Sequence, residues 1–197
     1  MVSMGVLALQ GAVREHLDCL HSLPGITGVP IKKAADLDRI DGLILPGGES
    51  TAIGKLLLEC QLGLPLIEKI QAGLPVWGTC AGMILLAKNI IGQTHCHLGL
   101  MDIIVRRNAY GSQLDSFTTS ACIPEVSSAP IPLVFIRAPY VEQVGPDVKV
   151  LATVADKFVA VEQAHMLATA FHPELTSNLE FHKYFVSKVR KQKLTFS

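Results

Sequence analysis

One cysteine in the chain has neighbours that favour nucleophilic chemistry. Cys80 is flanked at two places on either side by glycines, Gly78 and Gly82, in the order G-x-C-x-G. A short apolar strand (76–77) precedes it, and we expect a helix over 83–88. This order is typical of a nucleophile elbow, where a strained central residue needs small neighbours and the helix N-terminus favours the thiolate. The alternative is a buried cysteine in a tight turn, since free cysteines are often small core residues.

A thiolate that attacks a carbonyl needs donors for the charge that develops on oxygen. The N–H of Ala81, directly after the cysteine, is the first expected donor. The second is expected from Gly48 in the segment 46–51, PGGEST, because paired glycines let backbone N–H groups approach a ligand closely. A helix that begins there, with Ser50 or Thr51 as N-cap, would add a site for a carboxylate. A phosphate loop is the competing interpretation, but the G-x-x-x-x-G-K-[ST] pattern is absent.

A catalytic cysteine also needs a base and a group that orients the base. The best pair is His172 and Glu174, which follow the apolar run 166–170 and so lie at a strand end, where doubly wound sheets place their sites. The alternative is an exposed loop histidine near an acid. Four other histidines are weaker candidates, because they lie on helices, just after one or before a strand: His16, His21, His182 and His165.

Two further groups of residues have less specific patterns. Arg107 and Arg137 could clamp an amino-acid carboxylate, although each alone fits a surface arginine equally well. The cluster 95–97, HCH, offers three metal ligands but no fourth at a suitable spacing, so we expect no metal site there.

The elements that must position these residues alternate in the first ninety positions. Apolar runs at 4–9, 29–32 and 40–45 predict strands, and helical spacing over 13–20, 53–60 and 65–72 predicts helices between them. This order predicts βαβ units and a mostly parallel sheet. The second half predicts an antiparallel extension of the same sheet and a closing helix whose inner face carries Phe181, Phe185 and Val189. The expected strands there are 101–106, 117–123, 133–137, 148–154, 158–162 and 166–170.

Composition narrows the class of protein. With 197 residues, 49% of them hydrophobic, we expect one compact domain over 1–197. Seventeen basic residues balance 17 acidic ones, so no global charge recruits nucleic acid or a membrane surface. No apolar run is long enough to span a bilayer, and no signal peptide is apparent. Five cysteines without paired spacing favour reduced thiols in the cytoplasm.

Taken together, the motifs around Cys80, Gly48 and His172 resemble those of class I (triad) glutamine amidotransferases. The finer match is to the glutaminase subunits of pyridoxal phosphate synthases, and it spans nearly the whole chain. It rests on these further segments: Leu9-Gln10-Gly11-Ala12, Glu15-His16, Arg107-Asn108, Gly111-Ser112-Gln113, Asp115-Ser116-Phe117 and Phe135-Ile136-Arg137-Ala138-Pro139.

The resemblance implies a flavodoxin-like three-layer α/β sandwich and a role for each motif residue. Cys80 would be the nucleophile, His172 the acid/base and Glu174 its orienting group, with Gly48 and Ala81 as the oxyanion hole. The implied glutamine-binding positions are Gly48, Glu49, Ser50, Arg107, Ile136 and Arg137. No metal or organic cofactor is implied.

The resemblance also implies a partner. Such subunits hydrolyse L-glutamine and pass ammonia to a (β/α)₈-barrel synthase subunit that makes pyridoxal 5'-phosphate. We expect the segment Gln10-Gly11-Ala12 to touch that partner, because it lies at the same sheet edge as the glycine loop 46–51, which carries Gly48. Two alternatives stay open: a glutaminase that feeds another acceptor, and a non-catalytic regulatory module of the same fold.

Overall fold

The computed structural model describes residues 1–107 and 116–195. Five of the resemblance positions lie outside the described residues: Asn108, Gly111, Ser112, Gln113 and Asp115. Within the described part, no helix is both long and apolar enough to cross a membrane.

Strands and helices alternate in the first half of the chain, and strands dominate the second. The described strands are β1 (Val2–Leu7), β2 (Ile26–Ile31), β3 (Gly42–Leu45), β4 (Val76–Thr79), β5 (Ala87–Ile90), β6 (Met101–Arg106), β7 (Ser116–Ala121), β8 (Ile131–Ile136), β9 (Tyr140–Val144), β10 (Lys149–Val154), β11 (Lys157–Gln163) and β12 (Met166–Thr169). The helices are α1 (Val13–His21), α2 (Ser50–Glu59), α3 (Gly63–Gln71), α4 (Ala81–Leu86) and α5 (Glu180–Thr195), with short 3₁₀ turns η1 (Ala34–Arg39) and η2 (Pro173–Leu175).

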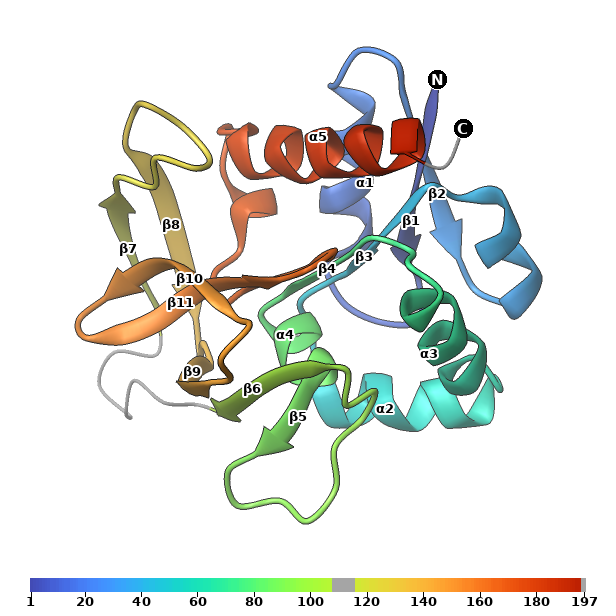
Figure 1. Cartoon of the computed structure of the whole chain (residues 1–197), viewed down its shortest axis with the longest axis horizontal. Coiled ribbons are helices and arrows are strands. Elements are labelled where there is room, and N and C mark those ends of the chain that lie inside the picture. Colours follow the sequence, from blue (N-terminus) through green and yellow to red (C-terminus); the bar gives the residue numbers. More distant parts are fainter. Residues whose placement is uncertain (108–115, 196–197) are drawn as a thin grey trace.

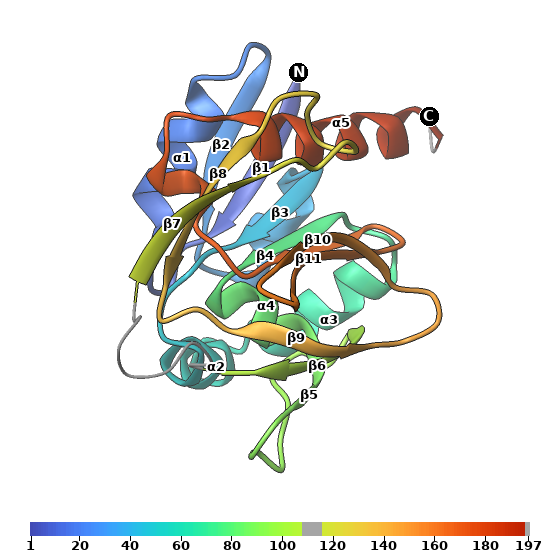
Figure 2. The same cartoon turned by 90° about the vertical axis from the view of Figure 1, so that its left-hand side faces the viewer.

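The main sheet has the order β2-β1-β3-β4-β12-β11-β9-β6-β5, with β10 paired to β11. The strands from β2 to β12 run parallel, while the pairs β12–β11, β11–β9 and β9–β6 are antiparallel. The predicted α/β fold, a mostly parallel sheet with an antiparallel extension, is therefore confirmed. Helices α1 and α5 cover one face of the sheet, and α2, α3 and α4 lie on the other (Figures 1 and 2).

One part of the predicted sheet is wrong. Strands β7 and β8, expected in the antiparallel extension, form a separate two-stranded sheet. The backbone of β8 bonds to a loop and not to a strand of the main sheet, since the N–H of His172 donates to the carbonyl of Val134 at 2.8 Å. The hairpin is thereby joined to the segment that follows β12.

The sequence also misplaced the end of the helix after the elbow. The helix was expected over 83–88, but α4 ends at Leu86 and the chain continues as β5, which pairs with β6. Ala87 has φ −61° and ψ 137°, an extended backbone, although alanine and lysine are good helix formers. Pairing with a neighbouring strand overrides that local preference. Strand β9 was not predicted.

The core behind the sheet edge is aromatic. Trp77 on β4 stacks with Phe181 of α5 at 6.1 Å between ring centroids and packs against Phe185 at 5.7 Å. Phe171, which follows β12, contacts Phe181 edge-on at 5.0 Å. The predicted inner face of the closing helix is confirmed, because Phe181, Phe185 and Val189 are all buried. This packing holds the ends of β4 and β12 next to α5.

Candidate active site

The site lies where four adjacent parallel strands end. Strands β1, β3, β4 and β12 are neighbours in the sheet, so their carboxyl ends meet at one edge. The loops that leave this edge carry Gln10, Gly48, Cys80 and His172, in that order of strands. From β1 the chain crosses to β2 on one side, and from β3 it crosses to β4 on the other side, so the strand order reverses between β1 and β3. Open α/β sheets bind ligands outside the strand ends at such a reversal.

Cys80 has the strained backbone that its setting predicted. Its φ is 49° and its ψ is −102°, in a region that non-glycine residues rarely occupy. A Cβ on Gly78 would overlap the carbonyl of Gly82, and one on Gly82 would overlap the carbonyl oxygen of Leu45. The N–H of Cys80 donates to the carbonyl of Thr169 at 2.7 Å, which ties the elbow to β12.

The helix behind the cysteine is short. Since α4 has only six residues, its dipole contributes less to thiolate stability than the expected longer helix would. Ala81 is the first residue of α4, so its N–H has no acceptor within the helix. The N–H of Ala81 therefore lies directly beside Cys80.

His172 lies between the cysteine and the glutamate. Its Nδ1 is 2.7 Å from Oε1 of Glu174, which is the expected contact on the nitrogen that does not face sulfur. Burial acts to lower the pKa of His172, but the hydrogen bonds and charges of Cys80 and Glu174 outweigh it and raise the pKa to about 10. The imidazole is therefore held as the cation between two potential anions.

The cap of α2 differs from the expected one. The N-cap is Glu49, not Ser50 or Thr51, and its carboxylate accepts from the N–H groups of Thr51 and Ala52 at 3.1 and 2.6 Å. The same carboxylate forms an ion pair with Arg107 at 3.0 Å. Burial acts to raise the pKa of Glu49, but these backbone donors and the Arg107 charge lower it overall. Glu49 therefore stays ionised at the mouth of the site.

The glycine loop is bound to the end of β1. The carbonyl of Gly47 accepts from the N–H of Ala12 at 3.0 Å, and Oε1 of Gln10 accepts from the N–H of Glu49 at 2.8 Å. Gly11 has φ 102°, and a Cβ there would overlap the Gly47 carbonyl oxygen. Gln10 and Gly11 are exposed. An exposed segment thus contacts the predicted oxyanion loop directly.

A cavity of about 500 Å³ opens above the sulfur. Ser50 lies in its wall, and the buried hydroxyl of Ser50 has no hydrogen-bond partner among the described residues. All six predicted substrate positions line this cavity, together with Cys80, Ala81 and His172: Gly48, Glu49, Ser50, Arg107, Ile136 and Arg137. Glu174 lies behind His172, outside the lining.

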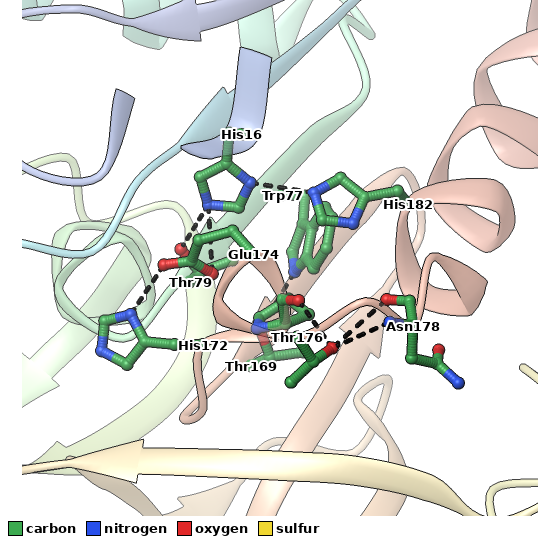
Figure 3. Close-up of polar contacts among 10 residues, drawn as sticks. His16, Trp77, Thr79, Thr169, His172, Glu174, Thr176, Asn178 and His182 are labelled. Carbon is green, nitrogen blue, oxygen red and sulfur yellow. Dashed lines mark hydrogen bonds and ion pairs between the residues drawn. The ribbon is translucent and has the colours of Figure 1, made fainter. Parts of the chain in front are cut away.

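Two histidines that the sequence ranked as weak candidates lie beside the site. His16 of α1 and His182 of α5 are fully buried, and His16 lies 3.5 Å from Glu174 (Figure 3). His16 was named only as part of the resemblance segment Glu15-His16, and nothing in the local sequence marks His182. The packing of α1 and α5 on the sheet brings His16 to Glu174 and His182 to His16. His21 is exposed on α1, and His165 contacts the carbonyl of Ile70 instead.

The described residues contain no group of three or more His, Cys, Asp or Glu side chains arranged to hold a metal ion. The 95–97 cluster lines a separate cavity of about 680 Å³ between α2 and the loop before Leu98. All five cysteines are free thiols.

A cysteine beside an imidazolium, at the carboxyl edge of a doubly wound sheet, fits the class I glutamine amidotransferase fold. Comparisons narrow the class further. Residues 6–191 match the SNO glutamine amidotransferase family. The chain therefore belongs to the SNO glutamine amidotransferase family.

Curated relatives and solved structures agree with this assignment. The pyridoxal 5'-phosphate synthase subunit PdxT of Ruminiclostridium cellulolyticum is 56% identical over 189 residues, covering 96% of this chain and 100% of that protein. The PdxT of Clostridium botulinum is 51% identical over 193 residues, covering 98% and 100%. A crystal structure of a glutamine amidotransferase superposes with a TM-score of 0.90 at 41% identity and covers 95% of this chain and 98% of that one.

The close packing at the elbow leads to a first prediction. Gly82→Ala places a methyl group against the backbone of Leu45, which cannot move without disturbing β3. We expect it to lower the free energy of unfolding by about 1–3 kcal/mol or more, the usual cost of overpacking. Urea unfolding followed by circular dichroism measures this. Gly63→Ala, which meets nothing closer than 3.8 Å, is the matched control and should leave stability nearly unchanged.

The raised pKa of His172 leads to a second prediction. A pKa raised from 6.5 to about 10 gives stability that is fully present below pH 6.5 and is lost as pH rises through about 10. Because Cys80 contributes to that rise, Cys80→Ala should lower the pKa of His172. NMR titration of the His172 ring in both proteins tests this, and an equal or higher pKa in the variant would contradict it.

Proposed function

We propose that the protein hydrolyses L-glutamine to L-glutamate and ammonia, as the glutaminase subunit of a pyridoxal 5'-phosphate synthase. The observation that carries the proposal is the arrangement of Cys80, His172 and Glu174. The first two residues lie in the wall of one cavity, and Glu174 forms a hydrogen bond with His172 behind that wall. The names of the PdxT relatives, which match this chain over nearly their whole length, support the particular synthase.

The reaction follows from the positions of these three side chains. The Cys80 thiolate attacks the side-chain amide carbon, and the oxyanion accepts hydrogen bonds from the Gly48 and Ala81 N–H groups. The His172 imidazolium gives its proton to the departing nitrogen, which leaves as ammonia. Neutral His172 then takes a proton from water, whose oxygen attacks the glutamyl thioester and releases glutamate and the thiolate.

The cavity has polar groups suited to an amino acid. Glu49 is ionised and can receive the substrate's ammonium group, whereas Arg137 offers a cation for its carboxylate. The unpaired Ser50 hydroxyl adds a buried donor and acceptor. Arg107, already paired with Glu49, fixes that carboxylate in addition to lining the cavity. Ile136 and Gly48 complete the proposed substrate contacts.

The acceptor of the ammonia is proposed to be a (β/α)₈-barrel synthase subunit. We propose that it docks on the segment 10–12, in which Gln10 and Gly11 are exposed and Gln10 and Ala12 form hydrogen bonds with the glycine loop. Docking there would act on the loop through two hydrogen bonds, so that turnover depends on the partner. The proposal includes a single glutaminase domain over 1–197, no cofactor and a cytoplasmic location, for which the five free thiols are the supporting feature.

The proposed nucleophile gives the deciding experiment. Cys80→Ala should abolish glutamate release, measured with and without the barrel subunit, while the circular dichroism spectrum and copurification with that subunit stay unchanged. Cys60→Ala, at an exposed free thiol, is the control and should keep wild-type turnover. Substantial turnover by Cys80→Ala would refute the assignment, and wild-type turnover that ignores the barrel subunit would point to another acceptor.

The roles of the histidine and glutamate predict an order of damage. His172→Asn should reduce kcat by about 10⁵-fold or more, because members of a triad act as a unit. Glu174→Gln keeps the shape and weakens only orientation and charge support, so its loss should be at least about tenfold smaller. Steady-state glutamate release by the complex measures both. A larger loss in Glu174→Gln would show that the roles are misassigned.

A further inference from the structure

A buried histidine stands behind the triad and reaches the side of Glu174 that His172 leaves open. His172 uses Oε1 of the carboxylate at 2.7 Å. The other oxygen, Oε2, is buried and has no hydrogen bond among the described residues, but Nε2 of His16 lies 3.5 Å from it. Figure 3 shows the His16 ring between Glu174 and His182. No other side-chain nitrogen of the described residues forms an ion pair with this oxygen.

Both buried rings are neutral. Burial, with the nearby charges of His182 and His172, holds the pKa of His16 well below its ordinary value. Burial lowers the pKa of His182 to about 4. Each ring therefore has one N–H and one lone pair at neutral pH. Nδ1 of His16 and Nε2 of His182 are 3.0 Å apart, so one of them donates to the other.

The surroundings decide which nitrogen of His16 carries the proton. A proton on Nδ1 would leave a lone pair at Nε2 facing the Glu174 carboxylate. It would also leave the buried Nδ1–H of His182 without an acceptor among the described residues. With the proton on Nε2, His16 donates to Oγ1 of Thr79 at 3.2 Å and directs positive charge at Glu174. On His182 only a lone pair is then unpaired, and an unpaired buried N–H is the rarer defect in native structures.

We propose that His16 is a positioning residue whose Nε2–H, bonded to Oγ1 of Thr79, directs its partial positive charge at the second carboxylate oxygen of Glu174, while His182 fixes the tautomer of the His16 ring. The donors then run in one direction, from His182 to His16 and from His16 to Thr79. The carboxylate of Glu174 thereby accepts the Nδ1–H of His172 at Oε1 and faces the Nε2–H of His16 at Oε2, 3.5 Å away.

The consequence for the reaction follows from the charge on Glu174. A buried carboxylate held at only one oxygen can rotate about its terminal torsion, which is soft. Rotation would weaken the bond that orients His172 toward the sulfur. The N–H of His16 opposes this rotation, because turning the carboxylate would take Oε2 away from it. Thr79, next to Cys80 in the chain, joins His16 to the elbow strand.

Kinetics of paired variants test the proposal in the complex with the synthase subunit. His16→Leu removes the donor and should lower kcat about three- to tenfold, the equivalent of one ordinary hydrogen bond, with little change in KM for glutamine. His16→Gln restores an N–H near the position of Nε2 and should recover most of the loss. His21→Leu, the same substitution at an exposed position of α1, should have wild-type kcat. Wild-type kcat in His16→Leu, or equal losses in the leucine and glutamine variants, would overturn the proposal.

A second test uses the wild-type protein, so it depends neither on the folding of a variant nor on glutaminase activity. The ¹⁵N chemical shifts of the His16 ring distinguish the two tautomers and the cation. The proposal requires a neutral ring with its proton on Nε2, and a proton on Nδ1 or on both nitrogens would refute it. The kinetic arm rests on the proposed glutaminase function, whereas the tautomer does not. A wild-type complex without glutamine turnover would therefore count against the function alone.

Discussion

The backbone of Cys80 is the constraint on which the rest of the site depends. Its φ of 49° is costly for a residue with a side chain, by about 1–3 kcal/mol, and persists because surrounding groups leave no alternative. Gly82 packs directly against the Leu45 carbonyl, and Gly78 against Gly82, so β3, β4 and α4 meet at distances that only glycine permits. This backbone places the sulfur at the sheet edge beside the N–H of Ala81, which has no acceptor within α4.

The neighbouring strands supply what that sulfur needs. Because β3, β4 and β12 are adjacent and parallel, the glycine loop, the cysteine and His172 leave the sheet side by side. The side chains then follow one another inward, from the Cys80 sulfur to the His172 imidazolium and to Glu174, and end on the neutral ring of His16. A neutral donor there avoids a second buried cation, which would compete with His172 for the same carboxylate.

Most of the fold and site could be predicted because their signals are local. Each short apolar run that precedes a glycine or histidine motif indicated a strand that ends at the motif. The carboxyl ends of adjacent parallel strands lie at one edge of the sheet, so the motifs lie close together. The predictions failed where distant partners decide. The N-cap of α2 is Glu49 and not the expected Ser50 or Thr51. Its longer side chain accepts from two N–H groups of the first turn and also pairs with Arg107. Helix α4 stopped at Leu86 because β6 offered backbone partners, and β7–β8 left the main sheet because the loop after β12 occupies β8.

The sequence by itself determined the elbow, the glycine loop and the histidine–glutamate pair, since each is a short motif whose residues are close in the chain. It likewise indicated the alternating elements that bring those motifs to one edge. Only the tertiary structure decided the surroundings of Glu174. His16 and His182 are 166 positions apart and meet at 3.0 Å solely because α1 and α5 pack on the same face of the sheet. A buried contact between two such distant polar groups leaves no spacing or periodicity in the sequence from which it could be read.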